Sequence, residues 1–201
     1  ETEYLIVDAQ GMLIPEAVRN PLLRQIPRSA SELCASSLET RTRPIPIIDA
    51  QGGLLFEATC VEAIARQVIE QADCRLVRIG AYPGAFEDLL ISQTPSRYQE
   101  LMDYCHALHG DKGPQQIGTL TLPLDLCRII GGCQSTHLNI QLPANNLAVQ
   151  LLNRAFEIVP ALLAVSASSA LMNMQPTGYQ EVRTPLWEVI FDYRHLDALL
   201  G

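Results

Sequence analysis

The sequence predicts an α+β fold, a largely antiparallel sheet with helices packed on one face. Short segments alternate like strands, other segments carry apolar residues at helical spacing, and hairpin-like pieces join them in an irregular order. The chain has 201 residues, 48% of them hydrophobic and 18% charged, and no low-complexity linker divides it. We therefore expect residues 1–201 to form a single domain with its own core.

The first half of the chain contains three predicted strands and one helix. Residues 1–15 read as a strand that ends in an Asp-Ala-Gln-Gly turn. An irregular piece leads into a second strand through Glu39 and Thr42. Residues 57–73 have the apolar spacing and early acidic residues of an amphipathic helix, and residues 74–83 read as a buried strand that enters a Gly/Pro loop.

The second half predicts a helix at 95–109 and an alternating strand at 136–142, "THLNIQL". A long helical stretch follows at 145–172, and Pro160 within it predicts a kink or a division near Val159. The apolar run inside this stretch is expected to be too short and too rich in Ser to span a bilayer. Residues 175–188 read as a polar loop and a strand.

The charge and the cysteines limit the classes of partner. Lys+Arg number 14 against 22 Asp+Glu, a formal net charge of -8 without a basic patch, which argues against nucleic acid and membrane surfaces as partners. The six cysteines form no CxxC pair and read as reduced thiols. We expect a cytoplasmic protein.

Two carboxylates stand together at the start of the chain. On a strand, Glu1 and Glu3 project from one face, whereas Tyr4 and Ile6 project from the other. Two like charges so close are unfavourable unless a cation lies between them. A solvated strand end is the alternative interpretation. Glu32 and Glu39 form a second, weaker acidic pair, seven residues apart.

The segment "GGCQSTHLNIQLP" places an imidazole and a carboxamide on one strand face. His137 and Asn139 follow the same period of two, and Leu138 and Ile140 face the other way. A neutral imidazole is a good ligand for a divalent ion, and an Asn amide can hold a substrate or phosphate oxygen. A hydrogen-bonded core histidine is the alternative.

The order of these motifs resembles the glutamate-cysteine ligase and carboxylate-amine ligase superfamily. The series comprises ExE on the first strand, an acidic residue seven before Glu-x-x-Thr, a Gly-x-x-Pro loop, Arg-Tyr on a helix and an HxN strand. It ends with "VPALLAVSASSALM" and "TGYQEVRT". The resemblance is greatest to the type 2 branch. It implies a fold related to glutamine synthetase, of which residues 1–201 would be the N-terminal part of the catalytic domain.

The resemblance implies an ATP-dependent ligase that joins the γ-carboxylate of glutamate to an amine such as that of cysteine, through an acyl phosphate, as in glutathione biosynthesis. By matching positions, it implies that Mg²⁺ or Mn²⁺ is bound, that Asn139 lies near the nucleotide, that Arg183 is a catalytic and substrate-binding residue, and that Thr177 shapes a substrate-binding loop. The implied metal ligands are Glu1, Glu3, Glu32, Glu39 and His137.

The chain departs from the family pattern at three points. Many type 2 members have HxH where this chain has His137 and Asn139, and an Arg-Asp pair is replaced by Gln175 and Pro176. Family members also continue beyond "TGYxSYRT", where a further metal-binding glutamate lies. Without family context, Arg183 reads as a salt-bridge partner of Glu181 or Glu188.

Three interpretations therefore stay open. The first is a ligase, seen as a fragment, as a shortened form or as one part of a split site. The second is a catalytically incomplete relative that binds metal or amino acid. The third is an assembly protein whose acidic pairs and His137 are structural, because a truncated sheet leaves an edge that could invite a second copy.

Overall fold

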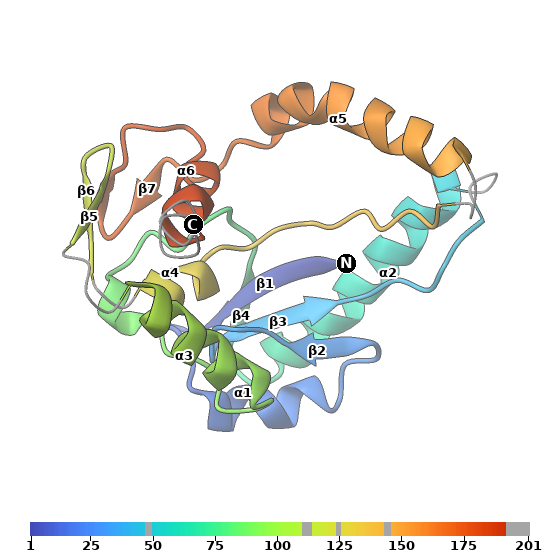
Figure 1. Cartoon of the computed structure of the whole chain (residues 1–201). Helices are drawn as coiled ribbons and strands as arrows, with labels where there is room; N and C mark the ends of the chain where they lie inside the picture. The colour runs from blue at the N-terminus through green and yellow to red at the C-terminus, as the bar shows by residue number, and fades with distance from the viewer. Residues whose placement is uncertain (47–49, 110–113, 124–125, 143–145, 192–201) are drawn as a thin grey trace.

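The computed structural model describes residues 1–46, 50–109, 114–123, 126–142 and 146–191. Its main sheet has four strands in the order β2-β3-β1-β4, and every ladder in it is antiparallel (Figure 1). The strands are β1 (Thr2–Val7), β2 (Ser29–Ser31), β3 (Ser37–Thr40) and β4 (Arg75–Val77). The α+β prediction with an antiparallel sheet is confirmed, and the relation to glutamine synthetase stays a prediction.

One face of the sheet is apolar and is covered by two helices. The side chains of Tyr4, Ile6 and Leu38 project from this face and pack into one core cluster. The cluster includes residues of α1 (Glu16–Leu23) and α2 (Ala50–Glu70). Since β1 alternates with period two, this packing turns Glu1 and Glu3 toward the opposite face, as the sequence predicted.

The opposite face is polar at one end and apolar at the other. Leu5 joins a second core cluster, which contains residues of α3 (Arg97–His109), α4 (Leu126–Gly131) and α6 (Arg183–Ile190). Helices therefore lie on both sides of the sheet, and the prediction that they pack on one face alone was wrong. The reason is Leu5, an apolar residue on the carboxylate face that must also be covered.

The remaining elements are short. A 3₁₀ turn spans Phe86–Asp88, and there are two antiparallel hairpins besides helix α5 (Asn146–Ser166). The first hairpin joins β5 (Gln115–Ile117) to β6 (Leu120–Leu122), and the second joins β7 (Leu171–Met172) to β8 (Gln175–Pro176).

The strand predicted at 136–142 does not form, and the one predicted within 175–188 is limited to the two residues of β8. Residues 136–142 contain only an isolated bridge between Thr136 and Thr2 and otherwise run without a ladder. Within 175–188 the chain enters α6 at Arg183. The buried residues Val182, just before this helix, and Leu186 and Ile190 within it are four apart, the spacing of a helix rather than a strand.

Two predicted helices have different bounds. The helix expected at 57–73 begins at Ala50, because Leu54, Ala58, Val61 and Ala65 already continue a helical stripe. The stretch expected to kink or divide near Val159 does not divide: it is one helix, α5 (Asn146–Ser166), with Pro160 inside it. The proline removes one backbone donor, and we attribute its tolerance to solvent, which can hydrate the freed carbonyl of an exposed helix.

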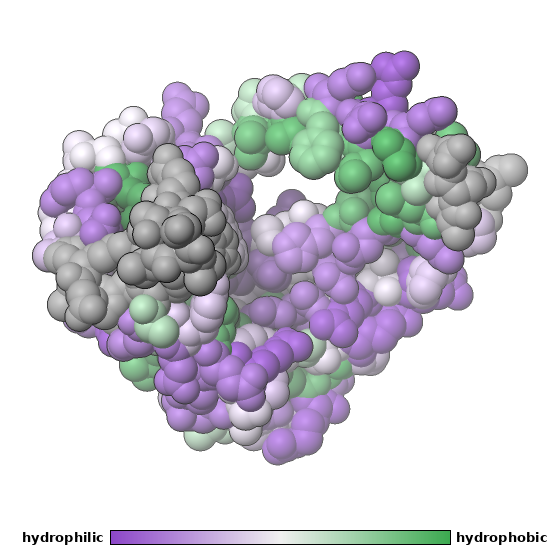
Figure 2. Space-filling view, viewed as in Figure 1, coloured by the Kyte–Doolittle hydropathy of each residue, from purple (hydrophilic) through white to green (hydrophobic). Residues whose placement is uncertain are grey.

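Helix α5 lies apart from the rest of the molecule (Figure 1). Its large apolar side chains are exposed, Phe156 by 66% and Val165 by 83%. Figure 2 shows an open passage beneath it, bordered by hydrophobic residues above and on the right and by mostly hydrophilic residues below. From Leu147 to Ser166 the helix is long and apolar enough to cross a membrane by length and composition alone, which is weak evidence for a span. This window begins before the apolar run considered in the sequence and includes Arg154 and Glu157.

The cysteines are not all reduced. Cys105 is disulfide-bonded, whereas Cys34, Cys60, Cys74 and Cys133 are free. The expectation of reduced thiols therefore fails at Cys105. Sequence spacing could not reveal this bond, because the fold decides which distant cysteines come into reach.

Candidate metal site

Five side chains from three separate segments converge on the polar face of the sheet. The ladder between β1 and β3 places Glu3 directly opposite Glu39, so their carboxylates share this face. Two groups result, each with ligand atoms within 4.8 Å of one another. The first is Glu1, Glu39 and His137, and the second is Glu3, Glu32 and Glu39. The structure thus brings together all five residues of the implied metal-ligand set.

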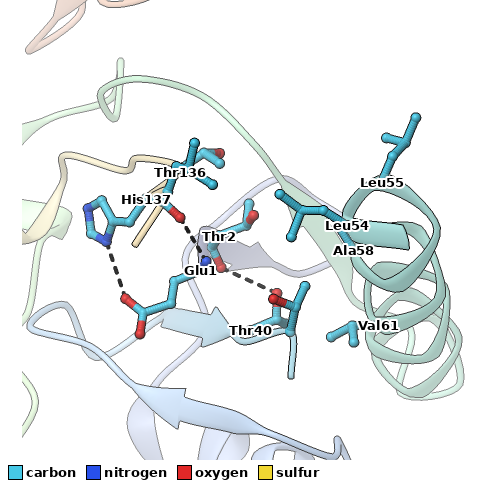
Figure 3. A pocket seen from close by; sticks show the side chains of 11 residues that line it. Glu1, Thr2, Thr40, Leu54, Leu55, Ala58, Val61, Thr136 and His137 are labelled. Carbon is cyan, nitrogen blue, oxygen red and sulfur yellow. Dashed lines mark hydrogen bonds and ion pairs between the residues drawn. The ribbon is translucent and has the colours of Figure 1, made fainter. Parts of the chain in front are cut away.

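Backbone hydrogen bonds hold His137 beside β1. The amide of Glu3 donates to the carbonyl of Ser135 at 2.9 Å, and the amide of His137 donates to the carbonyl of Glu1 at 2.8 Å. The imidazole is directed at the carboxylate of Glu1, with Nδ1 3.6 Å from Oε2 (Figure 3). The strand predicted at 136–142 does not form. His137 nevertheless lies beside Glu1, where that strand would have placed it, because these backbone hydrogen bonds hold its segment along β1.

Asn139 reaches the same carboxylate. Although burial by itself raises the pKa of Glu1, hydrogen bonding by the Asn139 side chain and the charge of Arg41 lower that pKa overall. His137 and Asn139 therefore both contact Glu1, as residues with a period of two should. The described contact of Asn139 is with a carboxylate, and its expected place near a nucleotide stays a prediction.

Arg41 was not identified from the sequence, although it lies among the acidic residues. Its guanidinium is in contact with Glu39, and its Nε lies 3.5 Å from Oε1 of Glu1. The hydrogen bond to Glu39 is the main cause of the raised pKa of Arg41. Arg41 thus supplies positive charge where two carboxylates of the first group meet.

The donor set fits a hard divalent cation. Carboxylate oxygens are the ligands preferred by Mg²⁺ and Mn²⁺, and a single imidazole is better tolerated by Mn²⁺. Glu39 is 4% exposed and belongs to both groups, so two cations could share its carboxylate. Burial, followed by the charges of Glu39 and Glu3, raises the pKa of Glu32 to about 7. A cation among these carboxylates would relieve that repulsion.

The raised pKa of Glu32 predicts that stability depends on pH in the metal-free protein. Its folded-state pKa of about 7 lies above the ordinary 4.5, so folding takes up a proton between these values. This stabilisation is fully present below about pH 4.5 and is lost as pH rises through 7. Urea denaturation with a chelator present measures the unfolding free energies of the wild type and of Glu32→Gln. The wild type should lose stability relative to the variant as pH rises across this window. A constant difference would contradict the prediction.

Arg183 is held by other residues of the protein. Its Nε lies 2.6 Å from Oε1 of Glu181, its Nη2 2.5 Å from Oε2, and its Nη1 donates to the carbonyl of Gln134 at 2.7 Å. Burial raises the pKa of Glu181, but the hydrogen bonds from Arg183 and Ser169, together with the charge of Arg183, outweigh it and lower that pKa to about 2. The salt bridge considered as an alternative is therefore present, and a substrate-binding role for Arg183 stays a prediction.

Two cavities adjoin the carboxylates. A cavity of about 300 Å³ has an apolar wall of Leu54, Leu55 and Ala58 and a rim that includes Glu1 and His137 (Figure 3). A polar cleft of about 760 Å³ is lined on the other side by residues that include Glu3, Gln134, Glu181 and Arg183. Thr177 is buried, lines neither cavity and bonds to Tyr179 within its own turn.

The fold and this site define an α+β protein with a carboxylate-rich candidate metal site beside two cavities. Residues 1–198 match the family model of glutamate-cysteine ligase family 2. The chain therefore belongs to this family of ligases, as the order of the motifs indicated.

Curated relatives agree with this family. A Mycolicibacterium vanbaalenii protein named "Putative glutamate--cysteine ligase 2-2" is 25% identical over 156 residues, which cover 78% of this chain and 36% of that protein. A Nocardia farcinica relative named "Putative glutamate--cysteine ligase 2-1" is 28% identical over the same length, covering 78% and 35%.

A longer match is to a Mycolicibacterium smegmatis protein named "Putative glutamate--cysteine ligase 2-3". It is 24% identical over 190 residues, which cover 93% of this chain and 46% of that protein. The chain thus spans about a third to a half of the length of these relatives. No solved structure matches the chain significantly.

Proposed function

We propose that the chain takes part in the ATP-dependent, metal-dependent formation of a γ-glutamyl amide. In this reaction ATP phosphorylates the γ-carboxylate of glutamate, and an amine such as that of cysteine attacks the acyl phosphate. The amide forms, and ADP and phosphate are released. The observation that carries the proposal is the convergence of Glu1, Glu3, Glu32, Glu39 and His137 into two groups that share Glu39.

Each part of the site has a task in this proposal. The five ligand residues would hold Mg²⁺ or Mn²⁺, which supplies neutralisation of phosphate charge during transfer. Asn139, which contacts Glu1, would meet the nucleotide beside the metal. Arg183 lines the polar cleft next to Glu3 and would bind the carboxylate of glutamate if its pair with Glu181 opens.

The test is calorimetric titration of the 201-residue chain, first with Mn²⁺, then with the non-hydrolysable nucleotide AMP-PNP and then with glutamate. Binding of all three ligands is expected from a competent ligase site. Failure of the metal-free chain to bind Mn²⁺ would refute the proposal. ATP hydrolysis that depends on both glutamate and an amine would establish the reaction itself.

Arg41 supports a second candidate function, a relative that binds ligands but does not transfer phosphate. Its guanidinium already neutralises Glu1 and Glu39, so the carboxylates of the first group have a partner without any ion. In that case nucleotide would not bind after Mn²⁺. The two candidates are therefore separated by whether nucleotide binds after Mn²⁺.

We expect Arg41→Gln to raise Mn²⁺ affinity about tenfold, because the metal no longer competes with a guanidinium for Glu39. The matched control is Arg43→Gln, which removes the same charge two residues away. Arg43 lies 3.5 Å from Glu57, outside the cluster, and its variant should keep wild-type affinity. Calorimetry measures both. If the Mn²⁺ affinity of Arg41→Gln is unchanged or weaker while Arg43→Gln keeps wild-type affinity, Arg41 does not compete with the metal.

A further inference from the structure

Ser135 links two of the proposed ligands. Its amide donates to Oε2 of Glu3 at 2.7 Å, and its hydroxyl lies 2.9 Å from the same oxygen. The same hydroxyl lies 2.5 Å from Nε2 of His137. A single side chain thus contacts Glu3 on one side and His137 on the other.

The proton inventory of these groups permits one arrangement that satisfies both contacts. An ionised carboxylate only accepts hydrogen bonds, so the one hydroxyl hydrogen of Ser135 goes to Glu3. The Ser135 oxygen must then accept from the imidazole, which places a hydrogen on Nε2 of His137. In the neutral ring, Nδ1 is left as the atom with a free lone pair.

The other ring nitrogen faces the first ligand group. Nδ1 of His137 lies 3.6 Å from Oε2 of Glu1. Without a proton on Nδ1, two lone-pair acceptors face each other there. That juxtaposition becomes favourable when a cation accepts both lone pairs, which is the arrangement a shared metal needs.

We propose that Ser135 is a positioning residue that holds His137 in the Nε2–H form, so that Nδ1 is its metal-binding atom. The assignment rests on the proposed metal-dependent function. Ser135 touches no metal in this scheme and acts through His137 and Glu3. Partners that orient a metal-binding histidine typically change metal affinity by about 10–100-fold when they are removed.

The opposite tautomer would undo this arrangement. A hydrogen on Nδ1 would point at Glu1 and occupy the position from which a metal is bound. Nε2 would then need the hydroxyl hydrogen of Ser135, and Glu3 would keep only the backbone amide of Ser135 as a donor. The hydroxyl of Ser135 therefore favours the metal-binding form of His137 over its alternative.

The test combines a spectroscopic and a binding measurement on the 201-residue chain. Long-range ¹H–¹⁵N NMR of the His137 ring, in metal-free protein at about pH 8.5 where neutral imidazoles prevail, reports which nitrogen carries the proton. We expect Nε2–H in the wild type and loss of that preference in Ser135→Ala. Calorimetry should show Mn²⁺ affinity about tenfold weaker in Ser135→Ala, and Ser135→Thr should restore both properties.

The matched control is Thr94→Ala. The Thr94 hydroxyl also bonds to a carboxylate, Oε1 of Glu16 at 2.7 Å, far from His137 in the chain. This variant should keep the wild-type tautomer and affinity.

Nδ1–H in the wild type would overturn the proposal without any variant. An unchanged tautomer and affinity in Ser135→Ala would also overturn it. A chain that shows Nε2–H and binds no Mn²⁺ would refute the metal-dependent function and the ligand role of Nδ1, while the control of the ring by Ser135 would stand.

Discussion

Glu39→Gln will weaken Mn²⁺ binding by more than any other single change among the proposed ligands, at least tenfold. Glu39 is shared by both ligand groups, so one substitution removes a carboxylate from each. Its side chain is almost completely buried, and water cannot easily replace the lost ligand. Removing only an outer partner of a ligand already costs about 10–100-fold in metal affinity. Calorimetric titration with Mn²⁺ measures the effect.

The control for Glu39→Gln is Glu57→Gln. Glu57 is also a buried glutamate with arginine partners, but it lies on α2 and bonds to Arg28 and Arg43. It should retain wild-type affinity. Glu3→Gln and His137→Ala should each weaken binding as well. Unchanged affinity in both of these variants would disprove a site shared between β1 and the segment around His137.

Arg19→Met will cost about 3–5 kcal/mol of unfolding free energy, the range for a buried charge pair that loses one partner. Arg19 is completely buried on α1. Its Nη1 donates to the carbonyl of Cys34 at 3.0 Å and to the hydroxyl of Ser92 at 2.8 Å, and its Nη2 pairs with Glu16 at 3.2 Å. Methionine fills similar space but removes all the guanidinium donors and the positive charge beside Glu16, although Cys34 and Glu16 keep their other hydrogen bonds.

Urea denaturation of Arg19→Met and Arg24→Met measures this cost. Arg24 follows the same helix and is exposed, so its replacement should change stability by less than about 0.5 kcal/mol. Equal stability of the two variants would show that the Arg19 network contributes little. The Arg19 contact with Cys34 also lies in the turn between Glu32 and Glu39, which ties the stability of α1 to the metal site.

The local patterns predicted much of the candidate site. Period two placed Glu1 and Glu3 on one face, and the order of motifs pointed to Glu32, Glu39 and His137. Their meeting in space could not be derived from spacing, because the register between β1 and β3 decides it. The resemblance supplied this step, and the structure supplied the distances.

The missed features depend on tertiary contacts. Arg41 looks like one charge in a polar stretch until the ladder brings it beside Glu39. The hydroxyl of Ser135 has no signature in the sequence. Pro160 predicted a kink or a division from a local rule, and the helix continues through it without dividing. Residues 143–145 and 192–201, which the predictions also covered, lie outside the described residues.

Helix α5 affects how the chain unfolds locally. In the described part of the chain none of the residues in its apolar window is buried, and Leu152 and Phe156 stay 49% and 66% exposed. Its stability therefore rests largely on its own helix–coil equilibrium, which Pro160 weakens by removing a backbone hydrogen bond. The helix can melt and re-form while both core clusters stay intact, so α5 is a separate unit of local unfolding rather than part of the cooperative core.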